Sequence, residues 1–378
     1  AALSAAFEKY GVPQETREEV KKGLDISSLA EIFPEEFLGE YLSGCRMEYA
    51  ADFSEGYWTD HFSYNLDLVE NYLRMYPDRE KELLFGSRYR YYSSGVRVLP
   101  LKDRLVEQDG KLCAYNSIVP AGKDCWYKAK DGKEVTLDLF GKLAGCALVK
   151  SATLDSQFIG LEMEGGKPGW NDAMNGLPGM NASSVPDGME VYRLNVFLIG
   201  KCAGLEKFEL LEEQAELLER MLAAADKEDV YVRFIEAKED FRAKVYAGLS
   251  GKTVEVRAEK LAALLYAVNK KIKEAIGRAQ EENGGIIPTF VPFEVTREGD
   301  GFSLKNLRFK KMCVASFLEA NAKGLKIKGF CDPEKLYAAV RASDMFDKKL
   351  KVYKTSESLE NESPMIGRVR TCSPGLYE

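Results

Sequence analysis

The chain has 378 residues, 45% of them hydrophobic and 30% charged, which is typical of a globular protein of one to three domains. Its formal net charge of −7 argues against a nucleic-acid-binding surface, so neutral or small polar ligands are expected. The eight cysteines form no Cys-x-x-Cys pair and His61 is the only histidine, which argues for reduced thiols and against a zinc site, a serine-type triad or a bound cofactor.

The first third of the chain alternates between helical and strand-like patterns. Residues 1–43 are typical of short amphipathic helices, broken at Pro13, Gly23 and Pro34. Within 56–76, apolar side chains recur every three or four positions, which predicts the buried face of a helix that Pro77 ends. Between 87 and 136, short aromatic and β-branched runs separated by Ser-Gly and Asp-Gly predict a β-hairpin-rich insertion.

Helical periodicity dominates the remainder, so the expected fold class is mainly α. It returns at 137–148 and, after a long loop, predicts helices at 191–202, 205–225, 230–249 and 258–282. Residues 286–295 are strand-like, but Pro288 and Pro292 favour an edge or an irregular crossing over a central strand. Asp332 and Pro333 predict the N-cap and first residue of a further helix.

The stretch from about 154 to 189 is expected to be a long loop. Its repeated glycines and prolines exclude a regular helix or a central strand. Loops of this length inside a compact domain are usually functional or disordered, and disordered segments avoid the Trp, Met and Leu found here. The sequence therefore predicts an ordered, catalytic loop.

Asp172 in this loop is the candidate proton donor. Trp170 beside it can desolvate the carboxyl group and raise its pKa, and an indole ring is a platform for the apolar face of a sugar. Asn171 and Asn175 can bind sugar hydroxyls, and Lys167 can bind a hydroxyl or phosphate. The alternative is that Trp170 is a packing anchor and that the Asp and Asn side chains cap turns.

Other polar side chains are candidates for the same cleft. Glu162 and Glu164 lie two residues apart and share a face in an extended segment; the alternative is a solvated pair. A second polar and aromatic wall is expected from Trp58, Asp60, His61, Tyr64 and Asn65. The alternative there is a helix N-terminus capped by Thr59 or Asp60. Arg368 and Arg370 are candidates for phosphate binding, or are simply solvated.

Three longer segments carry a family resemblance: residues 58–70 (WTDHFSYNLDLVE), 160–179 (GLEMEGGKPGWNDAMNGLPG) and 366–375 (IGRVRTCSPG). Together they resemble glycoside phosphorylases of glycoside hydrolase family 94, closest to the 1,2-β-oligoglucan phosphorylase branch and its cellobiose-phosphorylase-like relatives. The resemblance covers the chain from about residue 53 to its end. It implies an (α/α)6 barrel, with residues 1–378 forming the catalytic domain or an incomplete fragment of it.

The implied reaction is inverting phosphorolysis of β-linked gluco-oligosaccharides, β-1,2-linked in the closest branch, to α-glucose 1-phosphate. Asp172 is then the general acid. Inorganic phosphate is the co-substrate and replaces the activated water of an inverting hydrolase, so one carboxylate suffices. Such a reaction conserves energy as a sugar phosphate, which fits a cytoplasmic enzyme that needs neither nucleic acid nor membrane.

Two departures from the family pattern matter. Cellobiose phosphorylases have an acidic residue before the Trp and a glycine after the Asp, where this chain has Gly169 and Ala173, which argues against cellobiose as substrate. The relatives are also longer, and the chain begins at Ala1 without a methionine, so we expect a piece of a longer protein with further domains.

Two other functions stay open at this point. One is an inverting β-glucan hydrolase on the same barrel, with Glu162 or Glu164 as the base. The other is a non-catalytic carbohydrate-binding fragment that holds its ligand with Trp170 and Trp58.

Overall fold

The structure is a computed structural model that describes residues 2–23, 33–34, 38, 60–108, 111–114, 118–121, 126–164, 181–298, 301–309, 318–343 and 346–353. The chain divides into two compact units, residues 1–51 and 52–378, which are described separately.

The first unit contains helices α1 (Ala2–Lys9) and α2 (Gln14–Gly23). The rings of Phe7 and Phe33, both buried, stack with their centroids 5.9 Å apart. The Arg17 Nε donates to the carbonyl oxygen of Val12 at 2.6 Å, which ties α2 to the preceding turn. The expected break at Pro13 is confirmed, because α2 begins directly after it.

The second unit is mainly helical, as the sequence predicts. Its long helices carry the buried apolar stripes that the periodicity indicates, and α5 ends before Pro77 as expected. The described helices of this unit are α5 (Phe62–Met75), η1 (Pro77–Arg79), α6 (Glu80–Phe85), α7 (Leu101–Arg104), α8 (Leu139–Ser151), α9 (Val185–Cys202), α10 (Glu212–Ala224), α11 (Val230–Ala247), α12 (Ala258–Glu282), α13 (Leu318–Lys326) and α14 (Pro333–Ala342).

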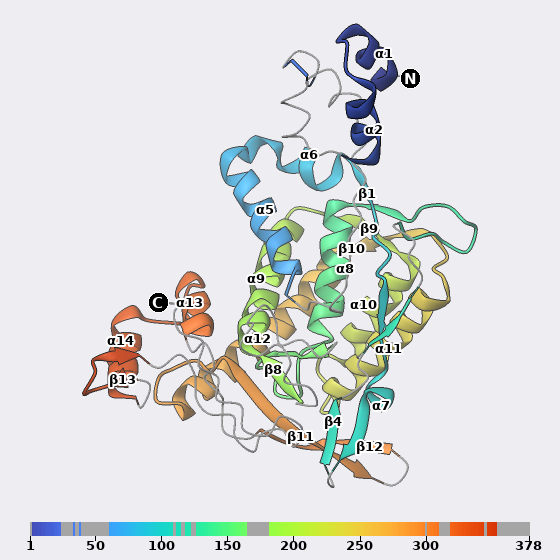
Figure 1. Cartoon of the computed structure of the whole chain (residues 1–378). Coiled ribbons are helices and arrows are strands. Elements are labelled where there is room, and N and C mark those ends of the chain that lie inside the picture. The colour runs from blue at the N-terminus through green and yellow to red at the C-terminus, as the bar shows by residue number, and fades with distance from the viewer. Residues whose placement is uncertain are drawn as a thin grey trace. The chain divides into compact units, whose positions relative to one another are not determined.

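One hydrophobic core joins α8, α9, α10 and α12, which lie side by side (Figure 1). Helix α12 buries one stripe, which includes Leu261, Leu265 and Ile272, and leaves its other face in water. Side chains around most of α8 are buried, because this helix contacts α9, α10 and α12. Its first turn is capped by Asp138, whose carboxylate accepts a hydrogen bond from the Gly141 backbone N–H at 2.7 Å.

Small antiparallel sheets lie around these helices. The β-rich insertion expected at 87–136 contains β1 (Arg88–Arg90), β2 (Val96–Val98), β3 (Leu105–Gln108), β4 (Lys111–Ala114) and β5 (Ile118–Pro120). Strand β1 pairs with β6 (Thr136–Asp138), β2 with β5, and β3 with β4. A separate pair joins β9 (Lys207–Leu211) to β10 (Thr253–Arg257), and another joins β13 (Phe346–Asp347) to β14 (Val352–Tyr353).

The one four-stranded sheet of the described chain has the order β12-β11-β8-β7, formed by Gly301–Phe309, Phe290–Glu298, Ala182–Ser184 and Leu161–Glu162. Residues 286–295 were expected to form an edge or an irregular crossing rather than a central strand; β11 has a neighbour on each side in this order, but not at the same residues. Its two neighbours pair with different halves, β8 with Phe290–Pro292 and β12 with the residues from Phe293 onward. Pro292 is tolerated there because this half of β11 pairs on one side only.

Two helix boundaries also differ from expectation. The helix predicted at 205–225 begins at Glu212, because residues 207–211 form β9. Helix α9 begins at Val185, before the predicted start at 191, since Ser184 caps it and Pro186 fits its first turn. The predicted loop at 154–189 is accordingly shorter, and its ends contain β7, β8 and the first residues of α9. The helix opened by Asp332 and Pro333 is confirmed as α14.

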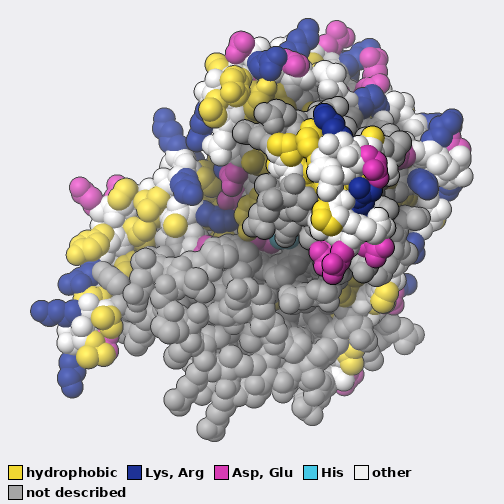
Figure 2. Space-filling model, turned by 45° about the horizontal axis from the view of Figure 1, so that its top comes forward, with side chains coloured by type: hydrophobic (Ala, Val, Ile, Leu, Met, Phe, Trp, Pro, Cys, Tyr) yellow, Lys and Arg dark blue, Asp and Glu magenta, His cyan; other side chains and the backbone are white. Residues whose placement is uncertain are grey.

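The described surface in Figure 2 carries acidic and basic side chains close together. Elsewhere among the described residues, exposed side chains form ion pairs, such as Arg220 with Asp240 and Lys260 with Glu219. Among the described helices, none combines the length and hydropathy that a bilayer crossing requires.

Candidate active site

The segment that contains the Trp-Asn-Asp motif is closed at its base by two paired strands. Glu162 of β7 lies opposite Ser183 of β8, and the Met163 backbone N–H donates to the carbonyl oxygen of Ala182 at 2.9 Å. The Asn181 side-chain amide donates to the carbonyl oxygen of Leu112 at 2.8 Å. These contacts therefore hold the residues on either side of 165–180 at neighbouring points of one scaffold.

Several sequence-predicted residues lie outside the described part of the chain, before, within or after this segment. They are Trp58, Lys167, Trp170, Asn171, Asp172, Asn175, Arg368 and Arg370.

A tight turn before β7 sets the direction of this strand. The carboxylate of Asp155 accepts hydrogen bonds from the backbone N–H groups of Gln157, Ile159 and Gly160 at 2.9, 3.1 and 3.0 Å. Burial raises the pKa of Asp155 to about 7. Phe158 has a φ of +60°, a strained value for a residue other than glycine. A Cβ on Gly160 would lie 2.8 Å from the Ser184 carbonyl oxygen, so the turn and β8 approach each other closely because this residue is glycine.

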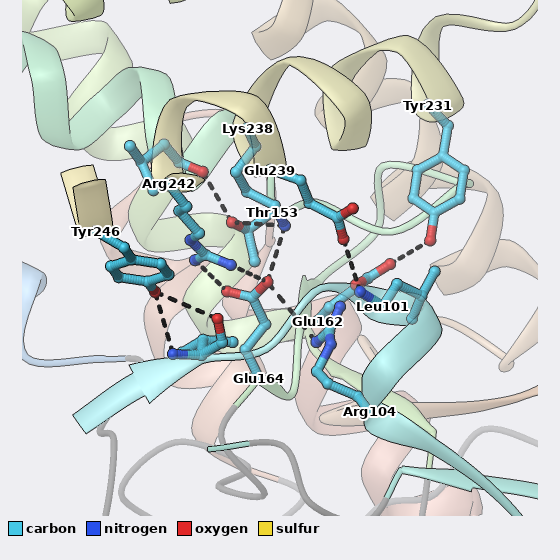
Figure 3. A network of polar contacts seen from close by, with 12 residues as sticks. Leu101, Arg104, Thr153, Glu162, Glu164, Tyr231, Lys238, Glu239, Arg242 and Tyr246 are labelled. Carbon is cyan, nitrogen blue, oxygen red and sulfur yellow. Dashed lines mark hydrogen bonds and ion pairs between the residues drawn. The ribbon is translucent and has the colours of Figure 1, made fainter. Parts of the chain in front are cut away.

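Glu164 is the centre of a buried charge cluster, which we define as Arg104, Glu162, Glu164, Lys238 and Arg242 (Figure 3). Its carboxylate accepts hydrogen bonds from Lys238 Nζ at 2.8 Å and from both terminal nitrogens of Arg242 at 2.8 and 2.6 Å. A terminal nitrogen of Arg104 lies 3.7 Å away. Although burial opposes ionisation, Arg242 and Lys238 hold the pKa of Glu164 well below its ordinary value.

Glu162 has a different environment within the same charge cluster. The Tyr231 hydroxyl donates a hydrogen bond to its carboxylate, and the side chain is 4% exposed. Burial raises the pKa of Glu162, while Lys238 and Arg104 partly offset this effect. The two glutamates thus share the cations Lys238 and Arg104, as expected for side chains on one face. The alternative of a solvated pair is wrong, because Glu164 is only 1% exposed.

Helix α11 supplies Lys238 and Arg242 to the charge cluster, and it also holds the segment that carries Arg104. Its Glu239 carboxylate accepts a hydrogen bond from the Leu101 backbone N–H at 2.7 Å, at the start of α7. Its Tyr246 hydroxyl donates to the Val98 carbonyl oxygen at 3.2 Å and accepts from the Val98 N–H at 3.1 Å. The β-rich insertion is therefore tied to α11 at the point where Arg104 reaches Glu164.

The sequence analysis missed Arg104, Tyr231, Lys238 and Arg242. A signal for two of them is present in α11, whose buried stripe runs through Tyr231, Phe234 and Lys238 at intervals of three and four. A lysine on an apolar helix face implies a buried carboxylate partner. Nothing comparable marks Arg104, which lies in a charged run between two short elements.

The predicted second wall is partly buried and partly at the surface. Asp60 is 1% exposed and accepts a hydrogen bond from the Tyr64 hydroxyl at 3.2 Å, whereas Tyr64, His61 and Asn65 are exposed. The ring centroids of His61 and Tyr64 lie 5.6 Å apart. The N-cap of α5 is His61, whose side chain makes no capping hydrogen bond, so a capping role for the Asp60 carboxylate is wrong; Thr59, the other candidate, lies outside the described residues.

Asp187, which the sequence analysis did not select, interacts electrostatically with Asp60. It lies in the first turn of α9 and is 1% exposed. Its pKa is raised to about 6, mainly by burial; Lys323 lowers the pKa and Asp60 raises it. Within the described chain, Asp60 Oδ1 and Asp187 Oδ2 are buried without a hydrogen-bond partner. Buried acceptors of this kind can be satisfied by the hydroxyl groups of a bound ligand.

A polar pocket of about 360 Å³ lies beside these residues. Its lining includes Tyr64, Asp67, Glu190, Arg193 and Lys323. Glu190 pairs with both Arg193, at 2.8 Å, and Lys323, at 3.2 Å. The pocket offers donors, acceptors and one exposed aromatic ring, a combination suited to a polar ligand such as a sugar.

No group of three or more His, Cys, Asp or Glu side chains suited to a metal ion occurs within the part of the chain that the structure describes. Comparisons with models of protein families and with curated proteins found no match for this chain.

Proposed function

We propose that this chain is the catalytic part of a glycoside phosphorylase that cleaves β-linked gluco-oligosaccharides, with β-1,2 linkages the first candidates. The proposal rests on the resemblance carried by residues 58–70, 160–179 and 366–375. The structural observation that supports it most is the pairing of Glu162 with Ser183, which holds both ends of the segment containing Asp172 on one rigid base.

In the proposed reaction, Asp172 donates its proton to the glycosidic oxygen as the bond from that oxygen to the anomeric carbon breaks. Inorganic phosphate attacks the same carbon from the opposite face, which gives α-glucose 1-phosphate and a shortened sugar. Trp170 serves as the sugar platform, and Asn171, Asn175 and Lys167 contact hydroxyls or phosphate. Arg368 and Arg370 are the proposed phosphate contacts.

Residues of the predicted second wall, together with Asp187, support this proposal because they could bind the sugar. Asp60 and Asp187 offer buried oxygens that lack a hydrogen-bond partner in the described chain, and Tyr64 exposes an aromatic ring beside them. We further propose that the helices of the second unit belong to an (α/α)6 barrel, which their mainly helical character supports. A cytoplasmic location follows from the value of sugar phosphates inside the cell, and Cys146, Cys202 and Cys331 are free thiols.

An inverting hydrolase on the same scaffold is the second candidate, and it needs a carboxylate base. Glu164 suits that role poorly, because Lys238 and Arg242 occupy its oxygens and keep its pKa low. Glu162 has a raised pKa but is buried and accepts a hydrogen bond from Tyr231. These environments favour phosphorolysis over hydrolysis.

The test is incubation with β-1,2-gluco-oligosaccharides and with cellobiose, each with and without phosphate, followed by assays for glucose 1-phosphate and free glucose. Phosphate-dependent glucose 1-phosphate is expected. Asp172→Asn should lower kcat by about 10²–10⁴-fold, since it removes the proton donor. The matched control is Asp226→Asn, which changes an exposed carboxylate and should leave kcat unchanged.

Three outcomes of these assays would each reject part or all of the proposed function. Full activity of Asp172→Asn would reject the assigned proton donor. Free glucose released without phosphate would indicate the hydrolase. Sugar binding without any product would indicate a carbohydrate-binding module.

A further inference from the structure

A second cavity, of about 920 Å³, lies apart from the charge cluster and the polar pocket. It is bordered by α5, by β1 and the residues after it, by α8 and by α11. Its size lies within the range of about 300–1,000 Å³ that is usual for small-molecule sites. Its aromatic lining consists of Phe62, Tyr89, Tyr91, Tyr92, Trp126, Tyr127 and Phe241.

The lining carries only one sign of charge. Arg88, Arg90 and Lys142 line the cavity, and none of its lining residues in the described chain is acidic. Two of these cations have a carboxylate partner elsewhere: Arg88 pairs with Glu209 at 2.6 Å, and Arg90 pairs with Glu134 at 3.4 Å. The Arg90 guanidinium also lies over the Trp126 ring, 3.8 Å from its centroid.

Within the described chain, Lys142 has no such carboxylate partner. Its Nζ donates a hydrogen bond to the Arg90 carbonyl oxygen and lies 4.2 Å from the centroid of the Tyr91 ring. No carboxylate in the described chain pairs with it, and burial alone lowers the pKa of Lys142 to about 8. An ammonium group on an apolar wall is stabilised when an anion is bound beside it.

The wall offers little to a neutral sugar. Its uncharged polar groups are the side-chain amides of Asn65 and Gln214, the tyrosine hydroxyls, the Trp126 indole N–H and the Cys146 thiol. The amide of Gln214 is already used at both ends: its nitrogen donates to the Tyr91 hydroxyl at 3.2 Å and its oxygen accepts from the Leu211 N–H at 3.2 Å. The Tyr127 hydroxyl is also used: it donates to the Val245 carbonyl oxygen and accepts from the Leu249 N–H at 3.2 Å, so fewer groups of this wall remain for the hydroxyls of a neutral sugar.

We propose that this cavity binds an organic anion with a flat apolar body, whose acid group pairs with the Lys142 ammonium while its rings contact the aromatic wall. Aromatic carboxylates and sulfonates have this chemistry. In the described chain, the site shares no residue with the charge cluster or with the predicted catalytic loop, and only Asn65 of the predicted second wall lines it, so its main contacts do not depend on the proposed function.

The probe is 8-anilinonaphthalene-1-sulfonate, whose fluorescence reports an apolar site and whose sulfonate supplies the anion. We expect saturable binding to the full chain. Lys142→Met should weaken this binding by about tenfold or more, because a hydrogen bond to a charged group is lost. The neutral relative N-phenyl-1-naphthylamine should bind both proteins equally. Lys260→Met, which changes an exposed lysine paired with Glu219, should leave the sulfonate affinity unchanged.

A second measurement locates the probe independently of the charge. Cys146 lines the same cavity, whereas Cys331 does not. The bound sulfonate should slow iodoacetamide labelling of Cys146, mapped by peptide mass spectrometry, and leave the labelling of Cys331 unchanged.

The variant Lys142→Arg keeps the positive charge, so its affinity for the sulfonate should stay within about threefold of wild type. This variant can be measured even if Lys142→Met fails to fold. Equal sulfonate affinity in Lys142→Met, or unprotected Cys146 at saturation, would overturn the proposal.

Discussion

At the scale of single residues, Glu164 has the most heavily paired carboxylate described in this chain. A buried carboxylate is costly without partners, and here Lys238, Arg242 and Arg104 supply them. If the carboxylate charge of Glu164 is removed, Glu162 is the only carboxylate left in the charge cluster to balance its three cations. The energetic consequence is therefore larger than the loss of one ordinary ion pair.

We predict that Glu164→Gln lowers the free energy of unfolding by about 3–5 kcal/mol, the usual cost of leaving a buried charge without its partner. Urea denaturation at pH 7 measures this difference. Glu259→Gln is the matched control, because Glu259 and its partner Arg257 are both more than 60% exposed. It should change the stability by less than about 1 kcal/mol.

The same comparison has a predicted pH dependence. Since the folded-state pKa of Glu164 is depressed, its contribution to stability is complete above its unfolded-state pKa of about 4.5 and is lost as the pH falls through the folded-state value. The stability difference between wild type and Glu164→Gln should therefore shrink below about pH 4.5. Equal loss at pH 7 from Glu164→Gln and Glu259→Gln would contradict the structural role assigned to Glu164.

At the scale of elements, α8 lies unusually close to β9 at one glycine. A Cβ at Gly141 would lie 2.5 Å from the Glu209 carbonyl oxygen and 2.6 Å from the Leu137 side chain. Glu209 belongs to β9, and α8 contacts this strand. An added methyl group would therefore push the helix away from the strand.

We predict opposite effects for alanine at two helical glycines. Gly141→Ala should destabilise the protein by about 1–3 kcal/mol, the range for overpacking. Gly277→Ala in α12 should stabilise it by about 0.5–1 kcal/mol, because a Cβ there meets nothing within 4 Å and alanine is the better helix former. Thermal unfolding followed by circular dichroism at 222 nm compares the two. The same sign for both variants would contradict the close approach of α8 to β9.

The elements that could be predicted from sequence are those whose signal is local. Helix α5 has its buried stripe and Pro77, and α14 has Asp332 as N-cap. Strands β9 and β10 were not predicted, because each finds its partner more than forty residues away, Phe208 opposite Val256. The alternation in β9 also merges with the helical period of α10, which hides the boundary.

The residues of the candidate site could also be predicted only in part. Glu162, Glu164 and Asp60 were recognised as chemically capable, but a sequence does not say which carboxylates are buried. Their cations come from α7 and α11, so the charge cluster exists only after folding. Asp187 was not selected, and the sequence placed it in the predicted loop at 154–189 rather than in the first turn of α9, where it is buried.

At the scale of the whole molecule, each unit has buried apolar side chains of its own. Among the described residues, the large core cluster takes all its members from Phe62 onward, whereas Phe7, Val12 and Phe33 are buried in the first unit. We predict that a protein comprising residues 52–378 unfolds within about 2 °C of the full chain, because its core is retained.

Thermal unfolding of both proteins under the same buffer conditions measures this shift. A much lower midpoint for residues 52–378 would mean that the second unit needs the first for stability.

The closure of β7 on β8 also bears on how such a protein can evolve. The points where the chain departs at Glu164 and returns at Asn181 are held by strand pairing, the charge cluster and the bond from Asn181 to Leu112, all outside residues 165–180. Doubling the length of a closed loop costs only about 0.6 kcal/mol. Insertions and exchanges within residues 165–180 should therefore be tolerated at little cost in stability, because they leave these contacts at Glu164 and Asn181 unchanged.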